Sequence, residues 1–115
     1  MPIVFPSSTA PAKASARRMT GIPSSRARFR SAIVDGHTDS VMCAYNALHG
    51  TPVCADDWLL GERLRRDWGF RGYVVSDCDA VDDMTKFHYF KPDNAQSSAA
   101  SIRAGTDLDC GYAYA

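Results

Sequence analysis

Three short apolar runs in this sequence alternate with segments that have helical spacing, and this alternation restricts the fold more than any other feature. Strands are expected at 40–45, 72–76 and 106–108, and helices at about 26–35, 56–67 and 94–104. Strands that alternate with helices along a chain predict a parallel sheet connected by crossover helices. The sequence therefore predicts an α/β fold built on about three parallel strands.

Local signals set the ends of the expected helices. Gly36 stands where a C-terminal glycine would end the first helix. Asp56 is expected to cap the second helix, and Asp93 with Gln96 resembles a capping box before the third. The apolar positions expected on the third helix are Ala95, Ala99, Ile102 and Ala104.

Charge is unevenly distributed along the 115 residues, although the formal net charge is zero. Residues 1–28 are rich in Pro, Ser and Arg and are expected to form a disordered basic arm, because such a composition buries too little apolar surface to offset ordering entropy. Residues 31–115 carry 7 basic and 13 acidic residues. A nucleic-acid partner is therefore not expected for this part, because phosphate binding needs clustered Lys and Arg. Segments 46–52 and 79–92 are expected to be irregular.

The four cysteines contain no C-x-x-C pair, which argues against a zinc ribbon or a thioredoxin-type motif. Cys43 and Cys54 are the pair that we expect to form a disulfide in an oxidising compartment. No segment is apolar for long enough to cross a membrane, and the N-terminus lacks the charged start and apolar core of a secretory signal. No membrane partner is expected, and the localisation stays open. The histidines follow no metal-ligand spacing, so neither a metal nor a cofactor is expected; they are His37, His49 and His88.

The strand expected at 72–76 ends directly in Asp77. In α/β folds the loops that leave the carboxyl ends of parallel strands converge, and ligands and catalytic groups lie there. Asp77 is therefore a candidate catalytic residue. The alternative is that its carboxylate caps the following helix, by accepting free backbone N–H groups.

An acidic cluster begins at this strand end, and it comprises Asp77, Asp79, Asp82 and Asp83. A calcium loop is not favoured, because the glycine for the sharp turn and the terminal bidentate acid are missing. The sequence 73–81 also matches the D-x-D-x-[TV] motif of haloacid-dehalogenase-type phosphatases, with Asp77 as nucleophile and Asp79 as acid. Few residues follow this motif, whereas such a domain needs a further lysine and acidic pair.

Four longer motifs support a third interpretation: SVMCAYN (40–46), GTPVCADDWLL (50–60), LRRDWGFRGYVVSDCDAV (64–81) and AGTDLDCG (104–111). In this order and spacing they resemble the N-terminal (β/α)₈-barrel domain of glycoside hydrolase family 3, in particular its β-xylosidase-like branch. The resemblance covers residues 29–111 and implies that the expected strands are the sixth, seventh and eighth of a TIM barrel. Residues 29–115 would then be a fragment of that domain, following the arm 1–28.

The resemblance also implies roles for individual residues. The family's nucleophile falls on Asp77, and a tyrosine that lies beside the sugar falls on Tyr45. Many β-glucosidases of the family have a tryptophan after the nucleophile, whereas this chain has Cys78, as in the xylosidase-like branch, which favours a pentose-containing substrate. Trp58 and Trp68 lie in or beside the second expected helix, and we expect them to pack in the core rather than to stack on sugars.

The implied function is retaining hydrolysis of O-glycosyl bonds in xylo- or gluco-oligosaccharides or aryl glycosides, without a cofactor. The family's general acid/base lies outside this stretch, and a partial TIM barrel exposes two sheet edges. We therefore expect the chain to be inactive alone and to self-associate through those edges. A truncated remnant without catalysis is the alternative, and the phosphatase motif at Asp77 and Asp79 is a second one.

Overall fold

A three-stranded sheet lies at the centre of the computed structural model, which describes residues 3–5 and 25–115. Strand β2 (Ser40–Cys43) pairs in parallel with β5 (Tyr73–Ser76), and the register places Val41 opposite Val74. Both of these valines are fully buried. The predicted parallel pairing of these two strands is confirmed.

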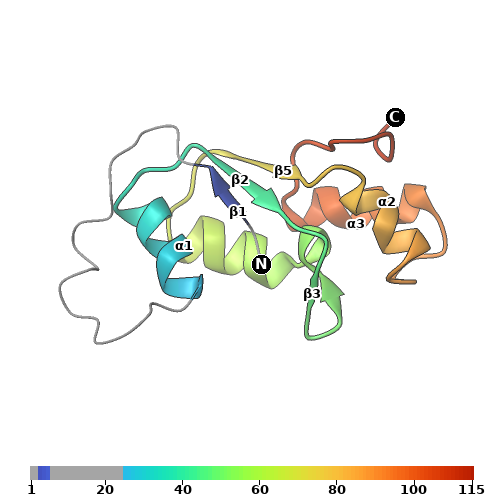
Figure 1. Cartoon of the computed structure of the whole chain (residues 1–115), viewed down its shortest axis with the longest axis horizontal. Helices are drawn as coiled ribbons and strands as arrows, with labels where there is room; N and C mark the ends of the chain where they lie inside the picture. The colour runs from blue at the N-terminus through green and yellow to red at the C-terminus, as the bar shows by residue number, and fades with distance from the viewer. Residues whose placement is uncertain (1–2, 6–24) are drawn as a thin grey trace.

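The third strand of this sheet is β1 (Ile3–Phe5), which pairs antiparallel with the other edge of β2 (Figure 1). It lies within the arm expected at 1–28, and helix α1 also begins inside that arm, at Ser25. The disorder of this arm stays a prediction. Its remaining residues lie outside the described part of the chain, and a domain boundary at residue 28 stays a prediction.

The strand expected at 106–108 is reduced to a single parallel bridge between Val75 and Leu108. The Asp107 carboxylate accepts the Val74 N–H at 2.8 Å, while the Asp107 and Leu108 N–H groups both donate to the Val74 carbonyl. A side chain thus takes a bond that a regular ladder would make with backbone. The prediction of a full third parallel strand is wrong for this reason.

The first predicted helix is confirmed as α1 (Ser25–Val34), but its end differs from the expectation. The left-handed residue is His37, with φ 51°, rather than Gly36. A Cβ on Gly36 would lie 2.6 Å from the Ala32 carbonyl oxygen, so the glycine is required by close approach of the backbone.

The second predicted helix is η3 (Trp58–Asp67), which is wound as a π-helix and ends in a bond from the Trp68 N–H to the Arg63 carbonyl. Asp56 supports its start, because its carboxylate accepts the Leu59 N–H at 3.0 Å. A short 3₁₀ turn, η2 (Val53–Ala55), precedes it.

A small hairpin was not expected in segment 46–52. Strands β3 (Ala47–Leu48) and β4 (Thr51–Pro52) pair antiparallel around His49 and Gly50. These two turn residues have φ values of 50° and 83°. Positive φ at both central residues is typical of a type I′ turn, which usually carries Asn-Gly or Asp-Gly, so His-Gly gave a weak signal.

Helix α2 (Ala80–Lys86) corrects the irregular segment expected at 79–92. Val81 and Met84 are fully buried and three residues apart, on one face of the helix. Asp82 lies in the first turn, where a carboxylate favours the helix dipole, and Lys86 pairs with it one turn later. This segment was predicted to be irregular because its many aspartates leave only two large apolar residues at helical spacing.

Helix α3 (Asn94–Ala104) begins and ends as predicted. The Asp93 carboxylate accepts the Gln96 N–H at 2.8 Å, and Gly105 closes the helix with φ 118°. Its buried face was predicted only in part, because Ala104 is buried as expected whereas Ile102 is 57% exposed. The buried positions are Ser97, Ser98, Ser101 and Ala104. These small side chains let α3 pack closely against α2, and α1 lies toward the opposite end of the sheet (Figure 1).

Candidate active site

Asp77 follows the carboxyl end of β5, as predicted, and its backbone is held by the neighbouring strand. The Asp77 N–H donates to the Cys43 carbonyl at 2.8 Å, and the Asp77 carboxylate accepts the Cys78 N–H at 2.8 Å. The N-cap position of α2 is Asp79, and its side chain makes no capping bond. The interpretation of Asp77 as a side-chain cap of this helix is therefore not supported.

Tyr45 comes from the loop after β2 and reaches the same place. Its hydroxyl donates to the Cys78 carbonyl at 2.7 Å. The pKa of Tyr45 is raised by partial desolvation and then by the nearby Asp77 carboxylate, with smaller contributions from the charges of Asp83 and Asp79. The two residues carried over from the family resemblance, Asp77 and Tyr45, are thus brought together although 32 positions separate them.

Two disulfides flank this strand end. The predicted pair Cys43–Cys54 is confirmed, and it is buried. A second bridge, Cys78–Cys110, was not predicted and lies at the surface directly beside Asp77. The signal was present: each of these cysteines follows an expected strand, and the carboxyl ends of adjacent parallel strands converge.

His88 lies in the loop that follows α2, is partly buried and supports the site. Its Nε2 atom lies 2.7 Å from the Tyr45 carbonyl oxygen, across 43 positions of sequence. It therefore ties the end of α2 to the backbone of the loop that carries Tyr45. The spacing of the histidines along the chain gave no signal for this contact.

The acidic cluster does not form one site. Asp82 pairs with Lys86 and accepts a hydrogen bond from Asn94, and these contacts lower the pKa of Asp82. Asp79 has left-handed φ, and its N–H donates to the Cys110 carbonyl at 2.6 Å. Within residues 3–5 and 25–115 no three His, Cys, Asp or Glu side chains are grouped so as to hold a metal.

A cavity of about 220 Å³ lies beside the start of α2. It is lined by Asp79, Asp82, Lys86, Asn94, Tyr112 and Ala113. Asp77 is not among the residues that line this cavity.

Comparison with known proteins matches residues 15–112 to the glycosyl hydrolase family 3 N terminal domain. The chain belongs to glycosyl hydrolase family 3. A probable exo-1,4-β-xylosidase of Aspergillus terreus is 45% identical over 89 residues, which are 75% of this chain and 12% of the relative. The chain thus spans about one eighth of the length of such relatives.

Solved structures of family members agree. A GH3 exo-β-xylosidase in complex with a xylobiose aziridine activity-based probe superposes with a TM-score of 0.74 at 44% identity, covering 76% of this chain and 12% of that one. A β-glucosidase from Erythrobacter marinus superposes with a TM-score of 0.72 at 36% identity, covering 74% of this chain and 11% of that one. Membership of glycosyl hydrolase family 3 leaves the haloacid-dehalogenase alternative without support.

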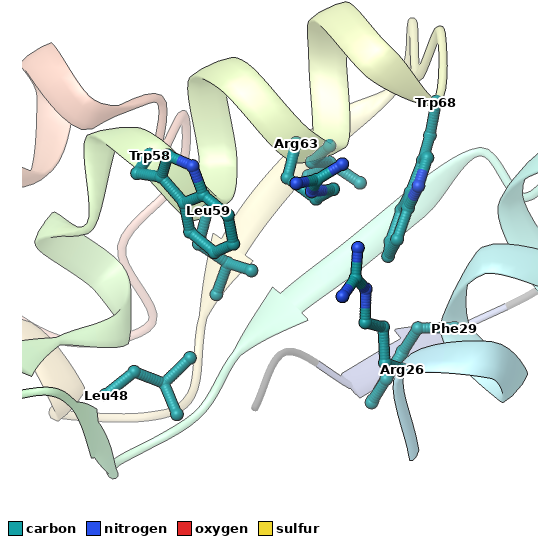
Figure 2. A pocket seen from close by; sticks show the side chains of 8 residues that line it. Arg26, Phe29, Leu48, Trp58, Leu59, Arg63 and Trp68 are labelled. Carbon is teal, nitrogen blue, oxygen red and sulfur yellow. The ribbon is translucent and has the colours of Figure 1, made fainter. Parts of the chain in front are cut away.

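A second cavity of this family 3 chain, of about 110 Å³, lies between α1, η3 and β3. Trp58 and Trp68 stand on opposite sides of it with Arg63 between them (Figure 2). Trp68 packs against the core as predicted. Trp58 does not, because it is 53% exposed and is covered by the Arg63 guanidinium, 5.0 Å from its ring centroid.

No helix among the described residues is long and apolar enough to cross a bilayer.

Tyr114 provides a pH-dependent prediction. Burial, and after it the charge of Asp109, raises the pKa of Tyr114 to about 12, and its hydroxyl donates to the Thr106 carbonyl at 3.0 Å. Folding favours the neutral phenol, so this stabilisation is complete below the ordinary pKa of 10 and is lost as pH rises from 10 through 12. Urea unfolding at stepwise pH should show the advantage of wild type over Tyr114→Phe shrinking in that interval. A difference that is constant between pH 9 and 12 would contradict the raised pKa.

Proposed function

We propose that this chain is part of the catalytic barrel domain of a retaining β-glycosidase that hydrolyses xylo- or gluco-oligosaccharides, with Asp77 as the nucleophile. The observation that carries the proposal is the placement of Asp77 at the carboxyl end of β5, with the Tyr45 hydroxyl bonded at 2.7 Å to the carbonyl of the next residue, Cys78. Relatives named as xylosidases and glucosidases support the reaction class.

Two carboxyl groups about 5–5.5 Å apart perform retaining hydrolysis. One carboxylate attacks the anomeric carbon and forms a covalent glycosyl–enzyme bond, while the other protonates the leaving oxygen as the glycosidic bond breaks. Water then hydrolyses the intermediate. We assign the first role to Asp77, and we place the acid/base in a part of the enzyme beyond these 115 residues.

The remaining site residues would shape the sugar subsite. Tyr45 would lie beside the sugar that reacts, and the position after the nucleophile is Cys78 rather than a tryptophan. A disulfide at this place leaves no aromatic wall, which favours a pentose-containing substrate.

We further propose that residues 29–115 supply the sixth to eighth strands of a TIM barrel, with residues 1–28 as a leading arm. The 115-residue chain would then hold one of two catalytic carboxylates and leave its barrel open. We expect it to be inactive alone and to self-associate through sheet edges, which sedimentation velocity measures.

The test uses an activated 2-fluoro-β-xyloside with a good leaving group, followed by peptide mapping. Such a reagent needs little acid catalysis, so a missing acid/base does not mask a working nucleophile. We expect no adduct on the isolated chain. We expect an adduct on Asp77 when residues 29–112 replace the matching segment of an intact family 3 xylosidase, and a labelling rate at least about 10³-fold lower for Asp77→Asn in that chimaera.

Asp83→Asn is the matched control, because it removes a nearby carboxylate and should keep labelling. An adduct on another carboxylate, or labelling that survives Asp77→Asn, would overturn the assignment of the nucleophile. Labelling of the isolated chain would keep that assignment and refute inactivity. A chimaera that folds but is never labelled would favour the non-catalytic remnant.

A further inference from the structure

Asp109 lies just after the short bridge at Leu108 and accepts hydrogen bonds from three donors. Its Oδ1 atom accepts the Ser76 hydroxyl at 3.1 Å. Its Oδ2 atom accepts the backbone N–H groups of Ala113 at 2.9 Å and Tyr114 at 3.3 Å. One carboxylate therefore holds the end of β5 and the turn at 113–114 together.

Ser76 connects this carboxylate to the candidate nucleophile, because it directly precedes Asp77. Its side chain is only 1% exposed. The Ser76 hydroxyl donates to Asp109 and accepts the Cys110 N–H at 3.0 Å. A buried hydroxyl with both functions satisfied has one favoured orientation, and loss of either partner leaves a buried polar group unpaired.

The same short segment also holds the residues after Asp77. The Asp79 N–H donates to the Cys110 carbonyl at 2.6 Å, and Cys110 is disulfide-bonded to Cys78. The loop that carries Asp77 is thus bound to residues 109–110 both before and after the candidate nucleophile. On its other side, the Asp77 N–H is bonded to the Cys43 carbonyl of β2.

We infer that Asp109 is a positioning residue for Asp77, which acts through the Ser76 hydroxyl to fix the strand end from which the Asp77 carboxylate projects. The inference rests on the proposed function for its catalytic meaning. Its physical content, the position of Asp77 relative to Tyr45, can be measured in the 115-residue chain without turnover.

Tyr45 is the reporter of that position. Its hydroxyl is bonded to the Cys78 carbonyl, and its pKa is raised in part by the nearby Asp77 carboxylate, whereas Asp109 is not among the groups that shift it. The Tyr45 pKa is followed by the carbon-13 shift of its Cζ atom. Hydrogen exchange of the Asp79 and Cys110 amides reports the two flanking bonds. Asp77→Asn gives the reference for loss of the nearby charge.

We expect Asp109→Ala to lower the Tyr45 pKa toward its ordinary value and to speed exchange of the Asp79 and Cys110 amides by about 10-fold or more. Asp109→Asn keeps one acceptor oxygen, which can serve Ser76, but its amide N–H₂ group cannot accept the Ala113 and Tyr114 N–H groups. We therefore expect both readouts of this variant to lie between those of wild type and Asp109→Ala. The matched control is Asp107→Ala, which removes a carboxylate from the same segment that contacts Arg65 and the Val74 N–H at the other end of β5. This control should leave both readouts unchanged.

The inference is overturned if Asp109→Ala leaves both the Tyr45 pKa and the two amides as in wild type. It is also overturned if Asp107→Ala has the same effect as Asp109→Ala, which would indicate general loosening. If Asp109→Ala does not fold, Ser76→Ala provides the same test, because it removes the connecting hydroxyl. Failure of the proposed function is seen separately, as absent labelling of Asp77 in the chimaera.

Discussion

Replacing Cys78 and Cys110 together by alanine lowers the free energy of unfolding by about 3.5 kcal/mol. The bridge joins residues 32 positions apart, and a cross-link stabilises mainly by restricting the unfolded chain, more so for longer loops. Replacing Cys43 and Cys54, which are 11 positions apart, should cost about 3 kcal/mol on the same basis. Chemical unfolding of the three oxidised proteins measures both differences.

The two disulfides should also differ in how readily they are reduced. Thiol–disulfide exchange requires access to a sulfur atom, and Cys43 and Cys54 are 0% and 1% exposed whereas Cys78 lies at the surface. Under native conditions a dithiol reductant should therefore open Cys78–Cys110 first, and differential alkylation with peptide mapping identifies the order. Reduction of Cys43–Cys54 first, or of both together, would contradict this expectation.

Leu60→Ala should lower the free energy of unfolding by about 3 kcal/mol, because the side chain is fully buried in the core. Leu60 lies on η3, and its Cβ atom is 3.6 Å from where a Cβ on Gly105 would lie, so it packs at the junction of η3 and the end of α3. Truncation leaves a cavity that rigid neighbours on both sides cannot fill.

The matched control for this substitution is Leu108→Ala. Leu108 is 51% exposed, and its contribution to the sheet comes from backbone bonds that alanine retains. We expect a change within about 0.5 kcal/mol. Equal losses for the two variants in denaturant unfolding would show that η3 is not part of the cooperative core.

Features that arise from neighbouring residues were predictable. The Asp93 capping box, Gly105 at the end of α3 and Asp56 before η3 each depend on groups within a few positions of one another, and each lies where the pattern indicated. Asp77 at the end of β5 was predictable for the same reason, because a short apolar run ended in acid. Helix α2 and the hairpin were both predicted as irregular segments. The aspartates of α2 are a mixed helical signal, and His-Gly is a weak turn signal.

Features that depend on distant residues were not predictable from local pattern. The apolar periodicity of α3 predicted that Ile102 faces the protein core. The helix instead buries serines against α2, because the space between two close helices admits only small side chains. The antiparallel pairing of β1 with β2 joins residues nearly forty positions apart. No short-range signal specifies such a partner.

Local patterns in the sequence specified two of the strands, three of the helices, the main caps, the carboxylate at the strand end and the motifs of glycosyl hydrolase family 3. Long-range packing, in contrast, brings Tyr45 to the residue after Asp77, joins Cys110 to Cys78 and places Asp109 against Ser76. The physical reason is that these contacts depend on the parallel alignment of β2, β5 and the segment at Leu108. That alignment brings together three loops from distant parts of the chain at one edge of the sheet.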